Sequence, residues 1–164
     1  EPSIFRSENY RIPLLMKPMP SVEEITALSG HEFPGGTYTV AHWENFLLTG
    51  CTGAELLPNG MVHPVALFHV PMMGANTSIA EMFELGQAES DLSVIPEYYD
   101  WEIFEPLKEE VTYEISGKIT NAERRQNDHG QTYDWLLFCF EIRSPDKTLA
   151  VRTTMAQQFT RNTL

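Results

Sequence analysis

The chain has 164 residues, with 11 Lys and Arg against 23 Asp and Glu, and therefore a formal net charge of −12. Hydrophobic residues make up 42% of it, which is enough for a buried core and excludes the composition of a disordered segment. The acidic balance disfavours nucleic acid and anionic membranes as partners, because both are bound chiefly through Lys and Arg. The length predicts a single domain over residues 1–164.

The basic residues are confined to the two ends of the sequence. Residues 18–107 contain no Lys or Arg but hold 13 of the 23 acidic residues. A solvated acidic surface would explain this distribution. If the protein instead binds an anionic ligand, its C-terminal part or a basic partner chain must hold that ligand.

The sequence carries no signal for a membrane span, a disulfide or a metal site. No stretch approaches the ~20 apolar residues of a membrane span, and we expect a cytoplasmic protein. Cys51 and Cys139 lie far apart and follow no C-x-x-C spacing, which predicts two unbridged thiols. The histidines do not fall at metal-ligand spacing; they are His31, His42, His63, His69 and His129.

Two short helices are predicted in the first third of the chain. Ser21 and Glu24 form a capping box that opens a helix through Leu28, with Gly30 to end it. After a Gly-rich turn at residues 31–36, apolar residues recur at helical spacing over residues 39–48, and Gly50 follows as a stop. The spacing predicts an amphipathic helix, and its apolar residues are Val40, Trp43, Phe46 and Leu47.

A long apolar run at residues 64–85 predicts the central helix. Pro64 suits the first turn of a helix and Gly86 its end. Pro71 lies inside the run and should kink or break the helix, because proline lacks an N–H and crowds the carbonyl four residues earlier. Three residues of the run either pack in the core or form the wall of a ligand pocket: Phe68, Met72 and Met73.

Beyond Gly86 the pattern changes to that of β-strands. Alternating or aromatic-rich runs predict four strands, at residues 98–104, 112–122, 133–143 and 148–159. Residues 127–130 and 144–147 are rich in turn formers and separate the last three of them. Helices followed by an antiparallel meander predict an α+β fold, with a helix lying across one face of a curved sheet.

The common motifs of hydrolases, nucleotide-binding proteins and metalloproteases do not occur in the chain. Its layout resembles the hot-dog fold of the MaoC-like, R-specific enoyl-CoA hydratases and acyl dehydratases. The shared features are a capped helix leading to a Ser-Gly turn, a long apolar helix, an extended strand, and two long strands joined by a polar turn. The best local match is residues 100–107, where Phe104 is followed by Pro106 and Leu107.

The hydratase motif of that family reads S-G-D-x-N-P-[LIV]-H. Its Asp and His act on one water molecule, since a carboxylate and an imidazole within reach of one water can take a proton from it and deliver one to the substrate. In this chain the motif falls on Ser29–Gly36, where Ser, Gly and Pro agree. His31 replaces the catalytic Asp, Phe33 the Asn, and Gly36 the catalytic His. A glycine cannot serve as an acid or base.

The resemblance implies a non-catalytic role. Some family members are heteromeric hydratases in which a larger inactive hot-dog chain pairs with a smaller catalytic one, and this sequence is similar to the larger chain in length and in its lost dyad. It would pair with a smaller catalytic MaoC-like subunit, as a heterodimer or a dimer of heterodimers, and wall part of the acyl tunnel. Acyl-CoA would be the substrate, and no cofactor is implied.

Three other functions remain open. The chain could be a self-sufficient hydratase with relocated groups, with His31 or His63 as the base and Glu32 as the acid. It could be a hot-dog acyl-CoA thioesterase that uses a residue of a predicted helix: Glu44, Asn45 or Glu81. It could also be a non-enzymatic acyl- or lipid-binding module built around Met72 and Met73.

CoA carries several negative charges, which the acidic middle of the chain would repel. We therefore expect the CoA phosphates to contact the partner or arginines of the C-terminal strands: Arg124, Arg125, Arg143 and Arg152. Of these, Arg124 and Arg125 stand beside a predicted turn and are the favoured pair.

Overall fold

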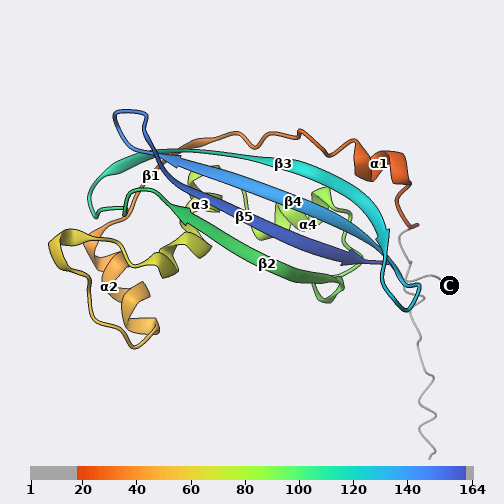
Figure 1. The fold of residues 1–164 in the computed structure, drawn as a ribbon, viewed down its shortest axis with the longest axis horizontal. Coiled ribbons are helices and arrows are strands. Elements are labelled where there is room, and N and C mark those ends of the chain that lie inside the picture. Colours follow the sequence, from red (N-terminus) through yellow and green to blue (C-terminus); the bar gives the residue numbers. More distant parts are fainter. Residues whose placement is uncertain (1–17, 162–164) are drawn as a thin grey trace, which may run out of the picture.

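A computed structural model describes residues 18–161, so the N-terminal cations Arg6, Arg11 and Lys17 lie outside the described residues. Within residues 18–161, five strands form one antiparallel sheet in the order β1-β3-β4-β5-β2, with β1 and β2 at its edges (Figure 1). The strands are β1 (Gly36–Thr39), β2 (Val94–Ile103), β3 (Thr112–Gln126), β4 (Thr132–Arg143) and β5 (Leu149–Thr160).

The four strands predicted from alternation are confirmed. β3 buries alternate residues from Tyr113 to Ile119, as a strand with one face on the core does. β2 begins four residues earlier than predicted and β3 ends four residues later. β1 is not predicted by the sequence, because its four residues stand between glycines and a helix signal. It forms by pairing with Thr112–Ile115 of β3.

The predicted central helix is divided into three short helices. They are η2 (Pro64–Phe68, a 3-10 helix), α3 (Val70–Gly74) and α4 (Ile79–Leu85). The break predicted at Pro71 is confirmed: Pro71 stands in the first turn of α3, where its missing N–H is not needed. A second break, which the sequence did not predict, occupies residues 75–78. There Asn76 has a φ of 53° and Ser78 caps α4.

Four further helical elements lie within the described residues: α1 (Val22–Thr26), α2 (His42–Cys51), η1 (Pro58–Gly60) and η3 (Asp91–Ser93). The predicted capping box opens α1. The Ser21 N–H donates to the Glu24 carboxylate at 2.7 Å, and the Glu24 N–H donates to the Ser21 hydroxyl at 3.1 Å. α1 ends two residues before Leu28, and α2 begins three residues later than predicted because residues 36–39 belong to β1.

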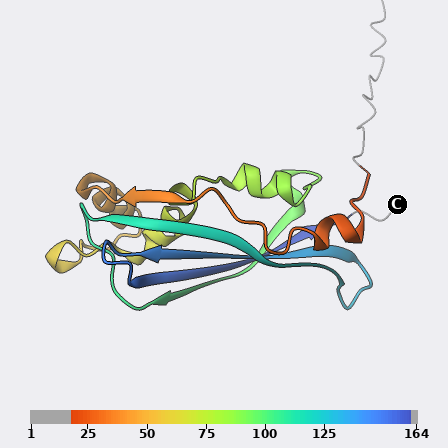
Figure 2. The same ribbon diagram turned by 90° about the horizontal axis from the view of Figure 1, so that it is seen from above.

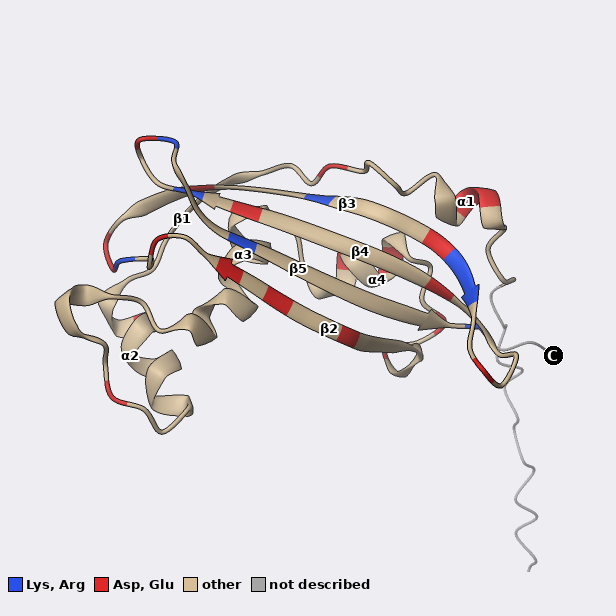
Figure 3. Ribbon diagram, in the orientation of Figure 1, with Lys and Arg blue, Asp and Glu red and all other residues tan. Residues whose placement is uncertain are grey.

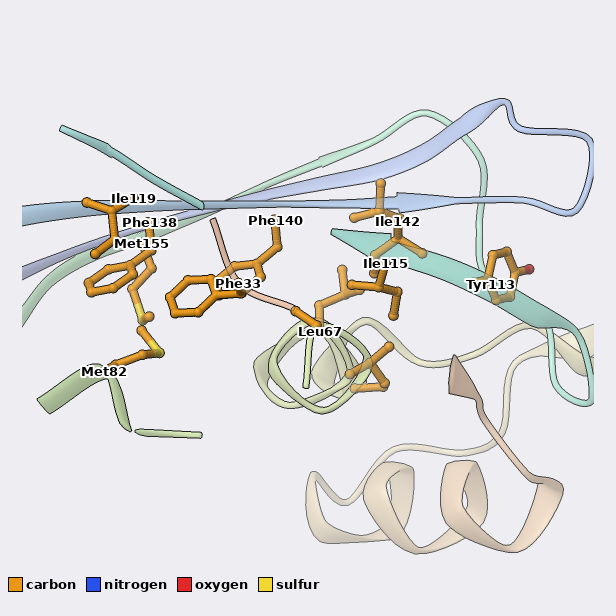
Figure 4. Packing of buried hydrophobic residues seen from close by; sticks show 14 of the residues in the cluster. Phe33, Leu67, Met82, Tyr113, Ile115, Ile119, Phe138, Phe140, Ile142 and Met155 are labelled. Carbon is orange, nitrogen blue, oxygen red and sulfur yellow. The ribbon is translucent and has the colours of Figure 1, made fainter. Parts of the chain in front are cut away.

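The hydrophobic core lies between the sheet and helices α3 and α4, which cover one of its faces (Figure 2). Figure 4 shows Phe33 and Phe140 close together in this layer. Glycines permit the close approach: a Cβ on Gly117 would lie 2.3 Å from the Phe140 ring, and one on Gly74 would lie 2.2 Å from Ile115. The ring of Phe33 and the helix α3 can therefore lie directly against the sheet.

α2 is turned so that its apolar side faces solvent. Trp43 is 65% exposed and Phe46 58% exposed, and Leu47 is exposed beside them. Asn45 and Thr49, on the polar side of the same helix, are buried. The predicted amphipathic helix exists, with its polar side against the rest of the chain.

Within the described range, no helix is both long and apolar enough to cross a membrane. Cys51 is exposed and Cys139 partly buried, and both are free thiols. In the same part of the chain, no group of three or more His, Cys, Asp and Glu side chains is placed to hold a metal ion.

Candidate functional site

An apolar groove lies between the edge strand β2 and the helices that cover the sheet. Its volume is about 400 Å³, within the range of small-ligand pockets. Phe68 and Ile79 are half exposed, so the groove reaches the surface beside β2. Its lining comes from five elements: Phe68 of η2, Met72 of α3, Ile79 and Phe83 of α4, Pro96, Glu97, Tyr98 and Tyr99 of β2, and Met155 and Gln157 of β5.

Three aromatic rings pack edge to face at this site. The Phe68 ring centroid lies 5.1 Å from that of Tyr99 and 4.9 Å from that of Trp101. The Tyr99 hydroxyl donates to the Leu67 carbonyl oxygen at 3.1 Å, which ties β2 to η2. Burial raises the pKa of Tyr99 to about 12, so the phenol stays a neutral donor. The aromatic wall is therefore well fixed and uncharged at neutral pH.

Two of the three predicted pocket residues line this groove. Phe68 and Met72 do, whereas Met73 is 55% exposed and is absent from the lining. One step along a helix rotates a side chain by about 100°, which separates Met73 from its neighbour. Flexible Met72 and rigid Phe68 together suit an apolar ligand of irregular shape.

One buried polar side chain interrupts the apolar lining. Gln157 is 4% exposed and lies on β5 between Met155 and Phe159, on the face that carries the core. Within the described residues its Oε1 has no hydrogen-bond partner, and its Nε2 donates to the Met155 sulfur at 3.5 Å. Sequence reasoning missed Gln157. A polar residue in a mostly apolar alternate row of a strand is the available signal, but Thr153 in the same row carries it too, so the sequence does not single out Gln157.

The segment Ser29–Gly36, on which the hydratase motif falls, runs alongside β3. The Phe33 N–H donates to the Gly117 carbonyl oxygen at 2.9 Å. The Phe33 ring is buried and stacks on the Phe140 ring with centroids 5.7 Å apart. This part of the segment builds the core and leaves no free polar group at position 33.

Close packing explains the glycine at position 36. A Cβ on Gly36 would lie 2.5 Å from Nδ2 of Asn76 and 2.9 Å from the Gly74 carbonyl oxygen. A histidine at this position would displace the turn between α3 and α4. In this conformation the chain supplies no imidazole at position 36 and has no room for one.

A second cavity, of about 690 Å³, lies on a different side of α4 from the groove. Its lining includes four ionisable side chains: His31, Glu32, Glu81 and Glu84. The structure thus brings together three residues proposed as catalytic alternatives. Among the described residues no hydrogen bond joins these side chains, and the His31 ring instead lies edge-on to Phe33 with centroids 5.5 Å apart.

His63, the other candidate base, is placed elsewhere. Its Nδ1 accepts a hydrogen bond from the Val65 N–H at 3.2 Å and so caps η2. It borders a small cavity of about 70 Å³ together with Leu57 and Ile103. The structure therefore does not bring His63 into one cavity with Glu32.

Glu44 is bound by two neighbours in the fold. Its Oε1 accepts a hydrogen bond from the Tyr38 hydroxyl at 2.8 Å and lies 2.7 Å from Nε2 of His69. Burial, and then the Glu44 carboxylate, raise the pKa of Tyr38 to about 12. These contacts fasten α2 to β1 and to the segment before α3.

Asn45 is the most fully bonded side chain of α2. Its Nδ2 donates to the Met61 carbonyl oxygen at 3.1 Å and to the Glu109 carboxylate at 2.7 Å. Its Oδ1 accepts from the His63 N–H at 3.0 Å. The two thioesterase candidates on α2 thus serve as structural anchors of that helix.

The arginines proposed for CoA phosphates are paired within the chain. Arg124 donates two hydrogen bonds to Asp134, at 2.7 and 3.0 Å, and a third to the Pro20 carbonyl oxygen at 2.7 Å. Arg125 bonds Glu123 and stacks on Trp135, with its guanidinium carbon 3.8 Å from the ring centroid. The Arg124 guanidinium is committed to these partners, whereas the Arg125 side chain is 35% exposed and more accessible.

No family model and no curated protein sequence matches this chain, but solved structures do. The ChsH1-ChsH2 complex from Mycobacterium tuberculosis matches with a TM-score of 0.63 and 10% identity, over 87% of this chain and 90% of that one. The C-terminally truncated HadBC (3R-hydroxyacyl-ACP dehydratase) complex from the same organism matches with a TM-score of 0.55 and 10% identity, over 82% and 98%.

A MaoC-like dehydratase from Phytophthora capsici matches with a TM-score of 0.58 and 12% identity, over 88% of this chain and 51% of that one. This chain has the hot-dog fold. The antiparallel hot-dog sheet laid over α3 and α4 confirms the fold that the sequence layout predicted. At such identities the likeness shows the fold, and the chemistry depends on the side chains described above.

Proposed function

We propose that this chain is the non-catalytic subunit of a heteromeric enoyl-CoA hydratase. It would pair with a smaller hot-dog chain that supplies the Asp/His dyad, and its groove would receive the acyl group. The observation that carries the proposal is the chemistry of the groove: a cavity of about 400 Å³ with an apolar and aromatic wall. The partly buried Tyr99 in that wall is a neutral phenol, and the Glu97 carboxylate accepts a hydrogen bond from Trp135.

The Glu97 carboxylate, which lines this groove, is held by two hydrogen bonds. Its Oε2 accepts hydrogen bonds from Trp135 Nε1 at 2.9 Å and from Gln158 Nε2 at 3.0 Å. A catalytic carboxylate must reach the proton that it transfers. The lining holds this one carboxylate and no imidazole, which supports a binding wall whose reacting groups come from the partner.

The edge strand β2 supports a partner that differs from this chain. β2 contains the acidic residues Glu97, Asp100 and Glu102 and no Lys or Arg. Its acidic positions are the red bands along the strand in Figure 3. Pairing β2 with β2 of a second copy would bring acidic strands together, and like charges on paired strands destabilise a sheet. A hot-dog chain with a basic edge would complement β2.

Two of the matched structures, ChsH1-ChsH2 and HadBC, are complexes. This agrees with a role for the present chain in a heteromer. The internal pairing of Arg124 with Asp134 favours the partner as the main source of cations for the CoA phosphates, with Arg125 as the contribution of this chain.

The proposal is tested by co-expressing the chain with short hot-dog chains that carry an intact G-D-x-N-P-x-H motif. We expect the purified chain alone not to hydrate trans-2-enoyl-CoA substrates, whether straight-chain or polycyclic, and the complex to do so. Alanine at the motif His of the short chain should abolish turnover while leaving the complex assembled. Turnover by this chain alone would contradict the proposal.

A second candidate function is supported by the cavity that holds His31, Glu32 and Glu81. There the chain itself would act on a thioester, as a hydratase with relocated groups or as a thioesterase. This function predicts that the chain alone turns over a thioester substrate and that adding a partner does not change the rate. His31→Ala should abolish this turnover. The proposed function predicts that His31→Ala leaves turnover by the complex unchanged.

A further inference from the structure

Gln157 is a carboxamide placed on the apolar inner face of the sheet. It stands opposite Leu136 on β4 and Pro96 on β2, and its neighbours in the same row of β5 are Met155 and Phe159. Within the described residues the Nε2 of this amide donates only to the Met155 sulfur and its Oε1 has no partner, so the oxygen loses its hydration without compensation and destabilises the fold. Exceptions of this kind occur at functional sites, where a ligand or water completes the bonding.

Gln157 is one of the residues that line the groove, so a ligand bound there would lie beside its side chain. Phe68, Met72 and Phe83 line the same cavity and offer it apolar contact. The Tyr99 hydroxyl already donates its proton to the Leu67 carbonyl oxygen. Gln157 is thus the buried side chain of this lining whose acceptor oxygen has no hydrogen-bond partner within the described residues.

The chemistry of a carboxamide selects the group that would meet it. A hydroxyl can donate to the amide oxygen and can also accept from the amide N–H, so it bonds Gln157 in either orientation of the amide. A carbonyl cannot donate to the free Oε1. A carboxylate or ammonium would lose its hydration in an apolar cavity without an opposite charge to pair with.

We propose that Gln157 recognises a hydroxyl group on the apolar part of the acyl group, so that the groove prefers hydroxylated acyl ligands. The inference rests on the proposed acyl-binding function and narrows its substrate class. Because the groove lacks an acid–base pair, the hydroxyl bound here is one that the substrate already carries. It is distinct from the hydroxyl that hydration creates at the partner's dyad.

Binding is measured by calorimetry on the full protein chain and on its complex. The ligands are dodecanoic acid and a series of monohydroxydodecanoic acids whose hydroxyl is placed at successive carbons from position 4 to position 12. We expect at least one isomer to bind about tenfold more tightly than dodecanoic acid, the usual effect of one additional buried hydrogen bond. Gln157→Leu should abolish this preference and retain the binding of dodecanoic acid.

Gln158→Leu is the matched control, because that amide lies next in the strand, bonds Glu97 and does not itself line the groove. It should retain the preference. Gln157→Leu should fold and melt no lower than the natural chain, since it removes an unsatisfied amide. If it fails to fold, Gln157→Met, of similar length and without a carboxamide, takes its place.

Two results would overturn the inference: equal binding of all isomers and dodecanoic acid, or a preference that survives in Gln157→Leu or Gln157→Met. A crystal structure with a hydroxydodecanoic acid bound, in which Gln157 contacts only an ordered water, would do the same. Absence of binding by every acid tested would instead count against the proposed acyl groove itself. The failures of the two proposals can therefore be told apart.

Discussion

α2 and the sheet place their apolar residues in opposite directions. In the sheet, Phe138 and Phe140 of β4 face the core, whereas in α2 Trp43 and Phe46 face solvent. The polar side of α2 is buried because each group there has a partner, as the bonds of Asn45 show. Amphipathic spacing therefore locates the two faces of an element, and the available partners decide which face is buried.

The largest effect is expected in the apolar layer. Phe140→Ala should lower the free energy of unfolding by about 3–5 kcal/mol, because it removes a fully buried ring on which Phe33 stacks. Urea unfolding followed by circular dichroism measures it. Phe46→Ala on the exposed side of α2 is the control and should change stability by no more than about 0.5 kcal/mol. Comparable losses for both variants would contradict the assigned burial.

Asn45, which anchors α2 through its hydrogen bonds, is expected to contribute somewhat less to the free energy of unfolding. Asn45→Leu should lower the free energy of unfolding by about 2–3 kcal/mol, because it leaves the Met61 carbonyl, the Glu109 carboxylate and the His63 N–H without this partner. The same urea titration provides the measurement. The half-buried Asn121 on β3 is the matched amide, and Asn121→Leu should have a much smaller effect. If Asn45→Leu leaves the free energy of unfolding unchanged, these hydrogen bonds do not anchor α2.

The attachment of α2 should weaken in acid. Hydrogen bonds from Asn45 and then from His42 hold the pKa of Glu109 below its ordinary value of 4.5. A lowered pKa in the folded state contributes stability that is present above the ordinary value and is lost as the pH falls through the folded value. Fluorescence of Trp43 on α2 should therefore change below about pH 4.5. Glu109→Gln should reduce the change in this window, and an unaltered titration curve would contradict the assignment.

The smallest effect is expected on the outer face of α2. Trp43→Ser combined with Leu47→Ser should leave the stability of the isolated chain within about 0.5 kcal/mol, because both side chains are exposed. Thermal unfolding at low protein concentration measures this. A loss above about 1 kcal/mol would mean that the face is covered in the isolated chain, and the contrast with the sheet would disappear.

Local signals in the sequence predict those parts of the fold that depend on local physics. The capping box of α1, the break at Pro71 and the four long strands are confirmed. β1 is invisible locally, because its four residues become a strand only through pairing with β3. The break at residues 75–78 has a local signal that the prediction did not use, because Asn76 adopts a positive φ and Ser78 caps α4.

The candidate site, like the fold, is predictable from the sequence only where the signal is local. Phe68 and Met72 stand out in the sequence because apolar side chains of this kind beside a broken helix suit a pocket. Both line the groove. The sequence alone gives Arg124 no partner and so leaves it free for a phosphate, but the register of β3 and β4 places it opposite Asp134. Gln157 becomes conspicuous only when the inner face of β5 is known to lie against the groove. Contacts of this kind depend on strand register, which the sequence does not specify locally.

The central proposal is that this chain pairs with a catalytic hot-dog partner, and the acidic edge strand β2 is the strand expected to meet that partner. Hydrogen exchange of the backbone amides, measured with and without the co-purified partner, tests it most directly, because β2 is an edge strand whose outer amides lack a neighbouring strand within the described residues. The account predicts that amides of β2 become protected in the complex while those of β1, the opposite edge, do not. Unchanged exchange in β2, or protection confined to β1, would contradict it.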